Sequence, residues 1–143
     1  MNEFIVADVL IANFLIVYHG GCRHTAQQAA AVHEGAASLP GVLARRVQVA
    51  DVDANALALF ARADAIVFGA PTYMGGPSAD FKRFADSTSN AWATQAWKNK
   101  IAGGFTSSDS LMGDTHATLQ YFCSLAVQHA MIWVGEGLPP SSS

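Results

Sequence analysis

Residues 12–25 read Ala-Asn-Phe-Leu-Ile-Val-Tyr-His-Gly-Gly-Cys-Arg-His-Thr. The first seven residues, 12–18, form a continuous run of apolar and β-branched side chains, which is typical of a strand buried on both faces. Gly20-Gly21 closes the run, and small and apolar residues then recur at helical spacing from Thr25 to Leu39, until Pro40-Gly41 ends the pattern. A buried strand that leads directly into a helix predicts the first half of a β-α-β unit.

The rest of the chain repeats this alternation of strand and helix. Further strands are predicted at 42–50, 65–70, 101–106 and 131–134. Helices are predicted at 54–63, 78–86, 114–129 and, as one short helix, within 87–100, and Asp51 and Asp53 can cap the first of them. Strict alternation predicts an α/β fold, a doubly wound parallel sheet of five strands with helices on both faces.

Length and composition indicate one domain. The chain has 143 residues, of which 51% are hydrophobic and 13% are charged, enough to bury one sizeable core. The domain is predicted to span residues 1–138. The terminal segment 139–143, Pro-Pro-Ser-Ser-Ser, is predicted to be a disordered tail or a truncated C-terminus.

Charge and cysteine usage exclude several classes of function. A net charge of -3 lacks the basic excess that nucleic acids or anionic membranes attract, so neither is expected as a partner. The longest apolar run, residues 4–18, is interrupted by Asp8 and Asn13, which argues against a transmembrane segment, and the basic start of a signal peptide is absent. Cys22 and Cys123 match no metal-ligand spacing, so we expect no metal site and a cytoplasmic location.

Three loops that follow predicted strands carry the candidate site. Ligands of open α/β sheets bind beyond the carboxyl ends of the strands. Residues 20–25 lead straight into a helix, so unpaired backbone N–H groups and the positive helix end favour a phosphate, although neither G-x-G-x-x-G nor a P-loop is present. The loop 71–75 suits a flat, partly polar ring, and residues 106–108 supply hydroxyl groups. A phosphate site beside a platform for a planar ring predicts a mononucleotide such as FMN. The candidate cofactor-binding residues are Gly20, Gly21, Cys22, Arg23, His24, Thr25, Pro71, Thr72, Tyr73, Met74, Gly75, Thr106, Ser107 and Ser108.

The segments 16–25, 68–75, 78–82 and 128–135 together resemble the WrbA-type NAD(P)H:quinone oxidoreductases of the flavodoxin-like family. Gly-Ala-Pro-Thr-Tyr-Met-Gly at 69–75 is the most specific of these signals. The resemblance implies a strand order of 2-1-3-4-5 and bound FMN. It also implies NADH or NADPH as the electron donor, a quinone that receives two electrons, and a homodimer or homotetramer.

The same resemblance implies roles for two residues outside the loops. Trp92 matches a family tryptophan that approaches a neighbouring subunit's flavin, so it joins the candidate cofactor-binding residues. His129 matches a histidine near the flavin pocket and is the candidate catalytic residue, which would orient or protonate the quinone oxygen. The alternative for His129 is a structural histidine at a helix end, where a cation is favoured.

The chain departs from the family pattern in ways that keep other functions open. Gly20 stands where the family usually has Ser or Thr, and Arg23 stands where it has Gly. Arg23 either replaces the lost hydroxyl donor or, in a left-handed backbone, adds strain. Relatives also continue past the fifth strand with a final helix that this sequence lacks, so a C-terminal stretch is missing or another subunit covers that face. The alternatives are a flavin-free scaffold or regulatory partner protein, and a one-electron flavodoxin carrier.

Overall fold

A computed structural model describes residues 10–21, 23–111 and 113–139 of the chain. Cys22 and most of the predicted tail 139–143 therefore lie outside the described residues. In chain order the elements are β1 (Ala12–Tyr18), α1 (Arg23–Ala37), β2 (Val42–Gln48), a 3-10 turn (Val49–Asp51), α2 (Ala54–Arg62), β3 (Ala65–Tyr73), β4 (Gly76–Pro77), α3 (Ala79–Ser87), α4 (Ser89–Ala93), β5 (Ile101–Ser107), α5 (Thr115–Gln128) and β6 (Ile132–Trp133).

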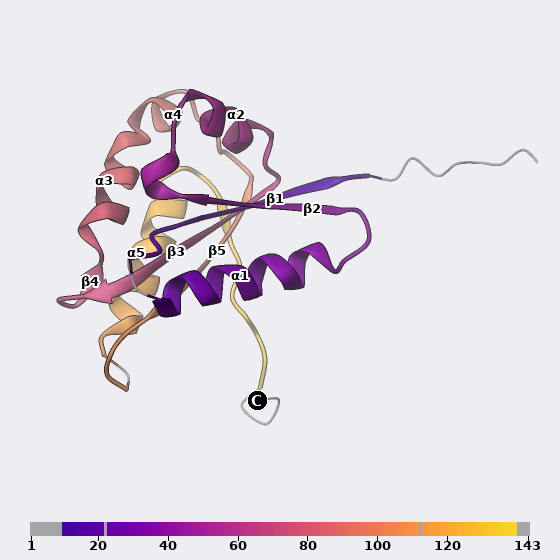
Figure 1. The fold of residues 1–143 in the computed structure, drawn as a ribbon. Helices are drawn as coiled ribbons and strands as arrows, with labels where there is room; N and C mark the ends of the chain where they lie inside the picture. Colours follow the sequence, from indigo (N-terminus) through magenta and orange to yellow (C-terminus); the bar gives the residue numbers. More distant parts are fainter. Residues whose placement is uncertain (1–9, 22, 112, 140–143) are drawn as a thin grey trace, which may run out of the picture.

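Five of the strands form a parallel sheet in the order β2-β1-β3-β5-β6. With β4 left aside, this is the predicted order 2-1-3-4-5, so the doubly wound fold is confirmed. Figure 1 shows α1 along one side of the sheet and α2 and α3 on the other side. Because all five strands run the same way, the loops after β1, β3 and β5 leave the sheet at the same edge.

The larger core lies between the sheet and helices α2, α3 and α5. Phe60 of α2, Phe81 of α3 and Phe122 of α5 are at most 1% exposed and pack against strand residues such as Phe68. The rings of Phe81 and Phe122 lie 4.8 Å apart, centroid to centroid. A smaller core, built on Ile16, Tyr18 and Ala29, joins α1 to the opposite face. The central strands β1 and β3 are thus covered on both faces, as in other doubly wound sheets.

The structure corrects the prediction that residues 71–75 form a plain loop. Strand β3 runs on to Tyr73 and pairs with β4 in antiparallel fashion, with Thr72 opposite Pro77 and Tyr73 opposite Gly76. Met74 and Gly75 form the turn with φ angles of 51° and 80°. A two-residue turn with positive φ at both positions matches the twist of a hairpin, so this segment is a β-hairpin. The sequence did not predict this hairpin because Pro77 argues against a central strand, although proline is tolerated in an edge strand.

Part of the α1 side of the sheet has no helix over it. Residues 134–139 form neither helix nor strand, and so no described helix follows β6. Ile101 and Ile132 are paired neighbours on this face, because Ala102 and Trp133 beside them point into the core. Ile101 is 40% exposed and Ile132 51% exposed. An apolar strip on β5 and β6 is thus open to solvent in the single chain.

Candidate functional site

The three candidate loops meet at the carboxyl edge of the sheet. Thr25 Oγ1, in the first turn of α1, lies 2.9 Å from Ser107 Oγ at the end of β5. Thr72 Oγ1, near the end of β3, lies 2.7 Å from Thr106 Oγ1. These two contacts join segments that are 82 and 34 residues apart in the sequence. The described residues of the three predicted loops, which exclude Cys22, are therefore brought together at one edge of the sheet.

The loop after β1 presents backbone rather than side chains. A Cβ built on Gly20 would come within 3.2 Å of the Gln48 and Tyr18 side chains, and one on Gly21 within 2.4 Å of the His19 ring. Glycine is thus required at position 21 unless the His19 ring moves. Helix α1 begins immediately afterwards and runs for 15 residues, so its first-turn N–H groups and its positive end face this loop.

Arg23 is the first residue of α1 and is exposed. Its backbone is part of a right-handed α-helix, so the strain of a left-handed backbone does not arise here. Its side chain makes no ion pair within the described part of the chain. A guanidinium group beside the helix start is therefore available to an anion. His24 is also exposed, whereas Thr25 is fully buried.

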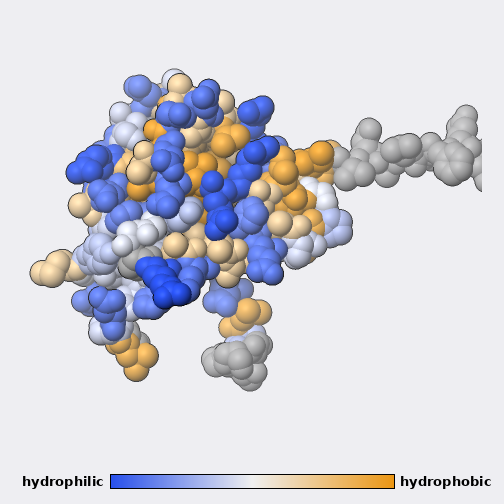
Figure 2. Space-filling view, viewed as in Figure 1, coloured by the Kyte–Doolittle hydropathy of each residue, from blue (hydrophilic) through white to orange (hydrophobic). Residues whose placement is uncertain are grey.

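The hairpin carries the side chains predicted to flank a ring. Tyr73 is 45% exposed and Met74 is completely exposed at the turn, while Pro71 and Thr72 are buried. A Cβ on Gly75 would lie 3.9 Å from Asp114 Oδ2, so the turn lies beside the start of α5. Figure 2 shows apolar surface at the tip of the neighbouring loop between β5 and α5, where Leu111 is 97% exposed. Exposed apolar side chains at a polar loop edge suit a flat aromatic ligand.

A cluster of three threonine hydroxyls, on Thr72, Thr106 and Thr118, lies at the base of the hairpin. Thr72 Oγ1 contacts Thr106 Oγ1 and, at 2.8 Å, Thr118 Oγ1 of α5, which is fully buried. Gln28 of α1 donates from Nε2 to the Thr106 carbonyl at 3.1 Å, and its buried Oε1 has no partner among the described residues. Sequence reasoning missed Gln28 and Thr118; the only available signal was a polar residue on the inward side of each helix. Ser108 instead turns to its own loop and donates to the Ser110 carbonyl.

His129 and Trp92 lie away from this edge of the sheet. His129 follows the last residue of α5, and the 14 residues of that helix span about 20 Å from its start beside the hairpin. Trp92, in α4, is 54% exposed and lines a shallow groove together with His129. The structure thus brings these two residues together, but it does not bring them to the candidate phosphate loop at residues 20–25.

His129 is 3% exposed and stacks on Trp97 with ring centroids 4.1 Å apart. Thr88 Oγ1 donates to the Ala85 carbonyl at 2.7 Å, so its one proton is used there, and His129 Nε2, 2.9 Å away, must be the donor to Thr88 Oγ1. His129 Nδ1 is then a buried acceptor without a partner in the described chain. Burial lowers the pKa of His129 below its usual 6.5, which favours the neutral ring.

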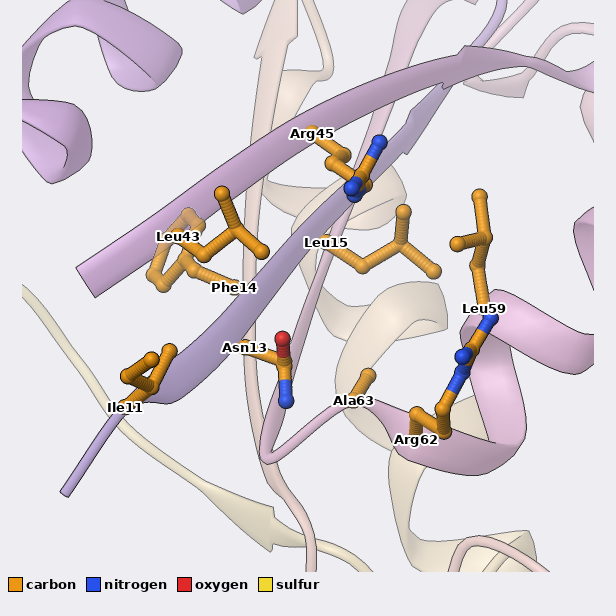
Figure 3. Close-up of a pocket in the computed structure, with 9 residues that line it drawn as sticks. All are labelled: Ile11, Asn13, Phe14, Leu15, Leu43, Arg45, Leu59, Arg62 and Ala63. Atoms are coloured by element: carbon orange, nitrogen blue, oxygen red, sulfur yellow. The ribbon is translucent and has the colours of Figure 1, made fainter.

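Another cavity, of about 350 Å3, opens at the amino ends of the strands. Figure 3 shows Arg45 of β2 and Arg62 of α2 at its rim, with Leu15 and Leu59 between them. This is the wrong end of a parallel sheet for a cofactor. Within the described ranges, three or more His, Cys, Asp or Glu side chains nowhere gather closely enough to hold a metal. No helix in the same ranges is long and apolar enough to cross a bilayer.

The groups at the carboxyl edge of the sheet match the chemistry of the predicted cofactor, FMN. The backbone of the two glycines lies beside a helix start, which is typical of a phosphate cradle, and the Gly20 N–H makes only a long hydrogen bond, 3.4 Å, to the exposed Gln48 Oε1. The unpartnered Gln28 Oε1 and the threonine hydroxyls offer polar contacts near the hairpin, and Tyr73 and Met74 offer apolar contacts for a ring. Each part of a mononucleotide has groups of matching chemistry.

Comparison with known proteins points the same way. The sequence profile of the NADPH-dependent FMN reductase family matches residues 19–139. Flavodoxin FldP of Pseudomonas aeruginosa is 42% identical over 130 residues, which cover 90% of this chain and 68% of that protein. An NAD(P)H dehydrogenase (quinone) of Solidesulfovibrio magneticus is 33% identical over 144 residues, covering 86% of this chain and 71% of that protein.

Among solved structures, a WrbA-like flavodoxin from Agrobacterium tumefaciens is 45% identical and superposes with a TM-score of 0.79, covering 86% of this chain and 76% of that chain. These likenesses confirm the flavodoxin-like fold, the WrbA-type resemblance and the predicted cofactors, FMN and a nicotinamide donor.

Proposed function

This chain belongs to the NADPH-dependent FMN reductase family, and from that premise we propose that it is an NAD(P)H:quinone oxidoreductase. Bound FMN would supply the chemistry for hydride transfer from the nicotinamide and for two-electron reduction of a quinone. The observation that carries the proposal is the convergence of the glycine cradle, the hairpin and the end of β5, linked by the contacts Thr25–Ser107 and Thr72–Thr106. No protein nucleophile is needed.

The residues of the chain hold and surround the reacting ring. The N–H groups at 20–25 and the Arg23 guanidinium bind the phosphate, with charge-assisted hydrogen bonds from Arg23. Tyr73 and Met74 flank the ring, and the hydroxyls of Thr106 and Ser107 lie at its polar edge, where donors stabilise the charge that the ring gains on reduction. Pro71 and Thr72 fix the base of the hairpin, because both are buried.

A second copy of the chain completes the site in this proposal. Trp92 and His129 line one groove, and they lie too far from their own cradle to act there. We propose that this groove faces the flavin of a neighbouring copy in a homodimer or homotetramer, with Trp92 against the ring and His129 near the quinone oxygen. As a ring held neutral by burial, His129 would carry no positive charge, and its Nδ1, an acceptor without a partner in the described chain, would receive a hydrogen bond from the hydroxyl of the reduced quinone.

One measurement separates the proposal from its rivals. The purified chain is titrated with FMN and with riboflavin and then given NADH or NADPH with a benzoquinone. We expect FMN to bind at least tenfold more tightly than riboflavin, and one quinone to be reduced for each nicotinamide oxidised. Failure to bind FMN would favour the flavin-free scaffold.

The one-electron carrier is the second candidate, because the Pseudomonas relative is named a flavodoxin. A carrier would bind FMN equally well. It would turn over nicotinamide and quinone slowly and would pass electrons only from a separate reductase. Stopped-flow reduction of the FMN-loaded protein by NADPH distinguishes the two, since only the oxidoreductase is reduced directly within catalytic turnover times.

A further inference from the structure

His19 connects the two halves of the candidate cofactor site. Its Nδ1 lies 2.7 Å from Ser78 Oγ, and its Nε2 lies 3.1 Å from Asp80 Oδ2. The backbone N–H of His19 donates to the Gly69 carbonyl at 2.9 Å, which prolongs the pairing of β1 with β3. The imidazole therefore uses both nitrogens on the start of α3 while its own backbone introduces the loop at 20–25.

The ring is packed against that loop as well. The 2.4 Å approach of a Gly21 Cβ to His19 Nε2 means that the imidazole fills the space beside Gly21. Only 16% of the His19 side chain is exposed. A displacement of the Gly20-Gly21 backbone would therefore be felt by the His19 ring at once, since close-packed groups transmit movement.

The partners of His19 are in turn fixed to the hairpin. Ser78 follows β4 directly, and its N–H donates to the Pro71 carbonyl at 3.2 Å, at the base of the hairpin. Its Oγ accepts from the Phe81 N–H at 3.4 Å and so caps α3. Asp80 is held from its other oxygen by Arg83 Nη1 at 3.1 Å. A continuous path of contacts runs from Gly21 through His19 and Ser78 to Pro71.

We propose that His19 is a positioning residue that couples phosphate binding at residues 20–25 to the arrangement of the hairpin that flanks the ring. The inference rests on the proposed FMN site but goes beyond it, because it makes the two binding events interdependent. A phosphate that holds the Gly20-Gly21 backbone in one conformation also restricts the imidazole of His19. The imidazole in turn restricts Ser78, which follows the second strand of the hairpin. Coupling between two sites is reciprocal, so each half of the ligand strengthens the binding of the other.

The test separates the two halves of the ligand. Riboflavin carries the ring without the phosphate, and inorganic phosphate serves as the other half. Riboflavin affinity is measured by fluorescence quenching with and without saturating inorganic phosphate, and the ratio of the two Kd values is the coupling factor. We expect a factor of about five or more in the unmodified protein.

Two variants remove the link in different ways. His19→Phe fills the same space without hydrogen bonds, and Asp80→Ala removes one partner at a half-exposed position. In both the coupling factor should fall toward one. His19→Gln, which keeps part of the hydrogen bonding, should restore an intermediate factor. Asp86→Ala is the matched control, because it breaks an ion pair with Lys82 on the same helix and should keep the full coupling.

Thermal unfolding of each apo variant shows that it is folded before the titrations are compared. A coupling factor retained in both His19→Phe and Asp80→Ala would overturn the inference and leave the proposed function intact. The same holds if phosphate leaves riboflavin affinity unchanged in the unmodified protein while FMN still binds. If the unmodified protein binds no FMN, the proposed function itself fails.

Discussion

Arg23 occupies the first position of α1, where the loop that we assign to phosphate becomes a helix. Its backbone is helical and its guanidinium is exposed and without an ion pair in the described chain. A guanidinium hydrogen bond to phosphate contributes roughly 1.5–3 kcal/mol. We expect Arg23→Ala to weaken FMN binding about tenfold or more and to flatten its dependence on salt, because one charge pair is lost. FMN titrations at two ionic strengths measure both effects.

Gly20→Ser in the Arg23→Ala background supplies the hydroxyl donor that the family usually has. The new side chain meets the Gln48 amide and the Tyr18 ring at 3.2 Å, and the exposed Gln48 side chain can move aside. Partial recovery of FMN affinity is therefore expected. Unchanged affinity in Arg23→Ala alone would place the arginine in solvent and remove it from the site.

His129 gives a pH dependence with a definite sign. Burial lowers the pKa of His129 in the folded chain below 6.5, its value in an unfolded chain. Above 6.5 the ring is neutral in both states and contributes no pH dependence. As the pH falls through 6.5 the unfolded state takes up a proton first, so the free energy of unfolding decreases, by at most about 1.4 kcal/mol per pH unit, until the folded pKa is reached.

His129→Phe should remove this component while preserving a ring on Trp97. Urea unfolding at several pH values between about 7 and 5 shows a shallower slope for the variant. His116→Phe replaces an exposed histidine of α5 and is the control for the exchange of a histidine for a phenylalanine. An equal slope in His129→Phe and the unmodified protein would mean that His129 titrates alike in both states.

A buried hydrogen bond between Thr72 Oγ1 and Thr118 Oγ1 joins the hairpin to α5. Thr118→Val keeps the shape of the side chain and removes its hydroxyl, while Thr72 retains its bond to Thr106. The free energy of unfolding should fall by about 1 kcal/mol, the usual net contribution of one hydrogen bond. Thr72→Val should cost more, because it removes the contacts with both Thr106 and Thr118 and leaves the fully buried Thr118 hydroxyl without this partner. Thr118→Ser, which keeps the hydroxyl, is the control, and denaturant unfolding is the measurement.

At the level of elements, the sequence predicted most of the sheet and less of its edges. The buried strands at 12–18, 65–70 and 101–106 were predictable because long apolar runs bounded by Gly, Pro or polar residues leave few alternatives. The N-terminal cap of α2 was also predictable. The structure confirms it, because Asp53 Oδ1 accepts a hydrogen bond from the Ala56 N–H at 2.9 Å. The β3–β4 hairpin was not, because its turn uses Met74 at a φ of 51°, a position that usually holds Asn or Gly.

The candidate site shows the same division between local and tertiary information. The loops 20–25, 71–75 and 106–108 followed from where parallel strands end, a rule of topology rather than of residue type. Gln28, Thr118 and the His19–Asp80 link could not be read, because each depends on a partner at least 46 residues away. The family resemblance identified Trp92 and His129 as candidates, but it did not predict that they lie away from the phosphate loop at 20–25 of the same chain.

At the scale of the whole molecule, two surfaces are incomplete in the single chain. The strip that includes Ile101 and Ile132 is apolar and half-exposed, and the groove of Trp92 and His129 lies far from the cradle that it is proposed to serve. A contiguous apolar surface is disfavoured in a soluble monomer, and closed symmetric assemblies are the usual way to cover one. Both surfaces therefore predict self-association.

Light scattering of the FMN-loaded protein should give a mass that is two or four times 15.1 kDa. If the Trp92 groove faces a neighbouring flavin, Trp92→Ala should lower that mass or reduce quinone turnover, because it removes a side chain that lies against the ring bound by the neighbouring copy. Ile132→Lys tests the strip separately and should shift the mass alone, with Leu57→Lys on α2, also half-exposed, as its control. A monomer with full turnover would overturn the assembly and the role of Trp92 together, since a site completed by a second copy cannot work without one.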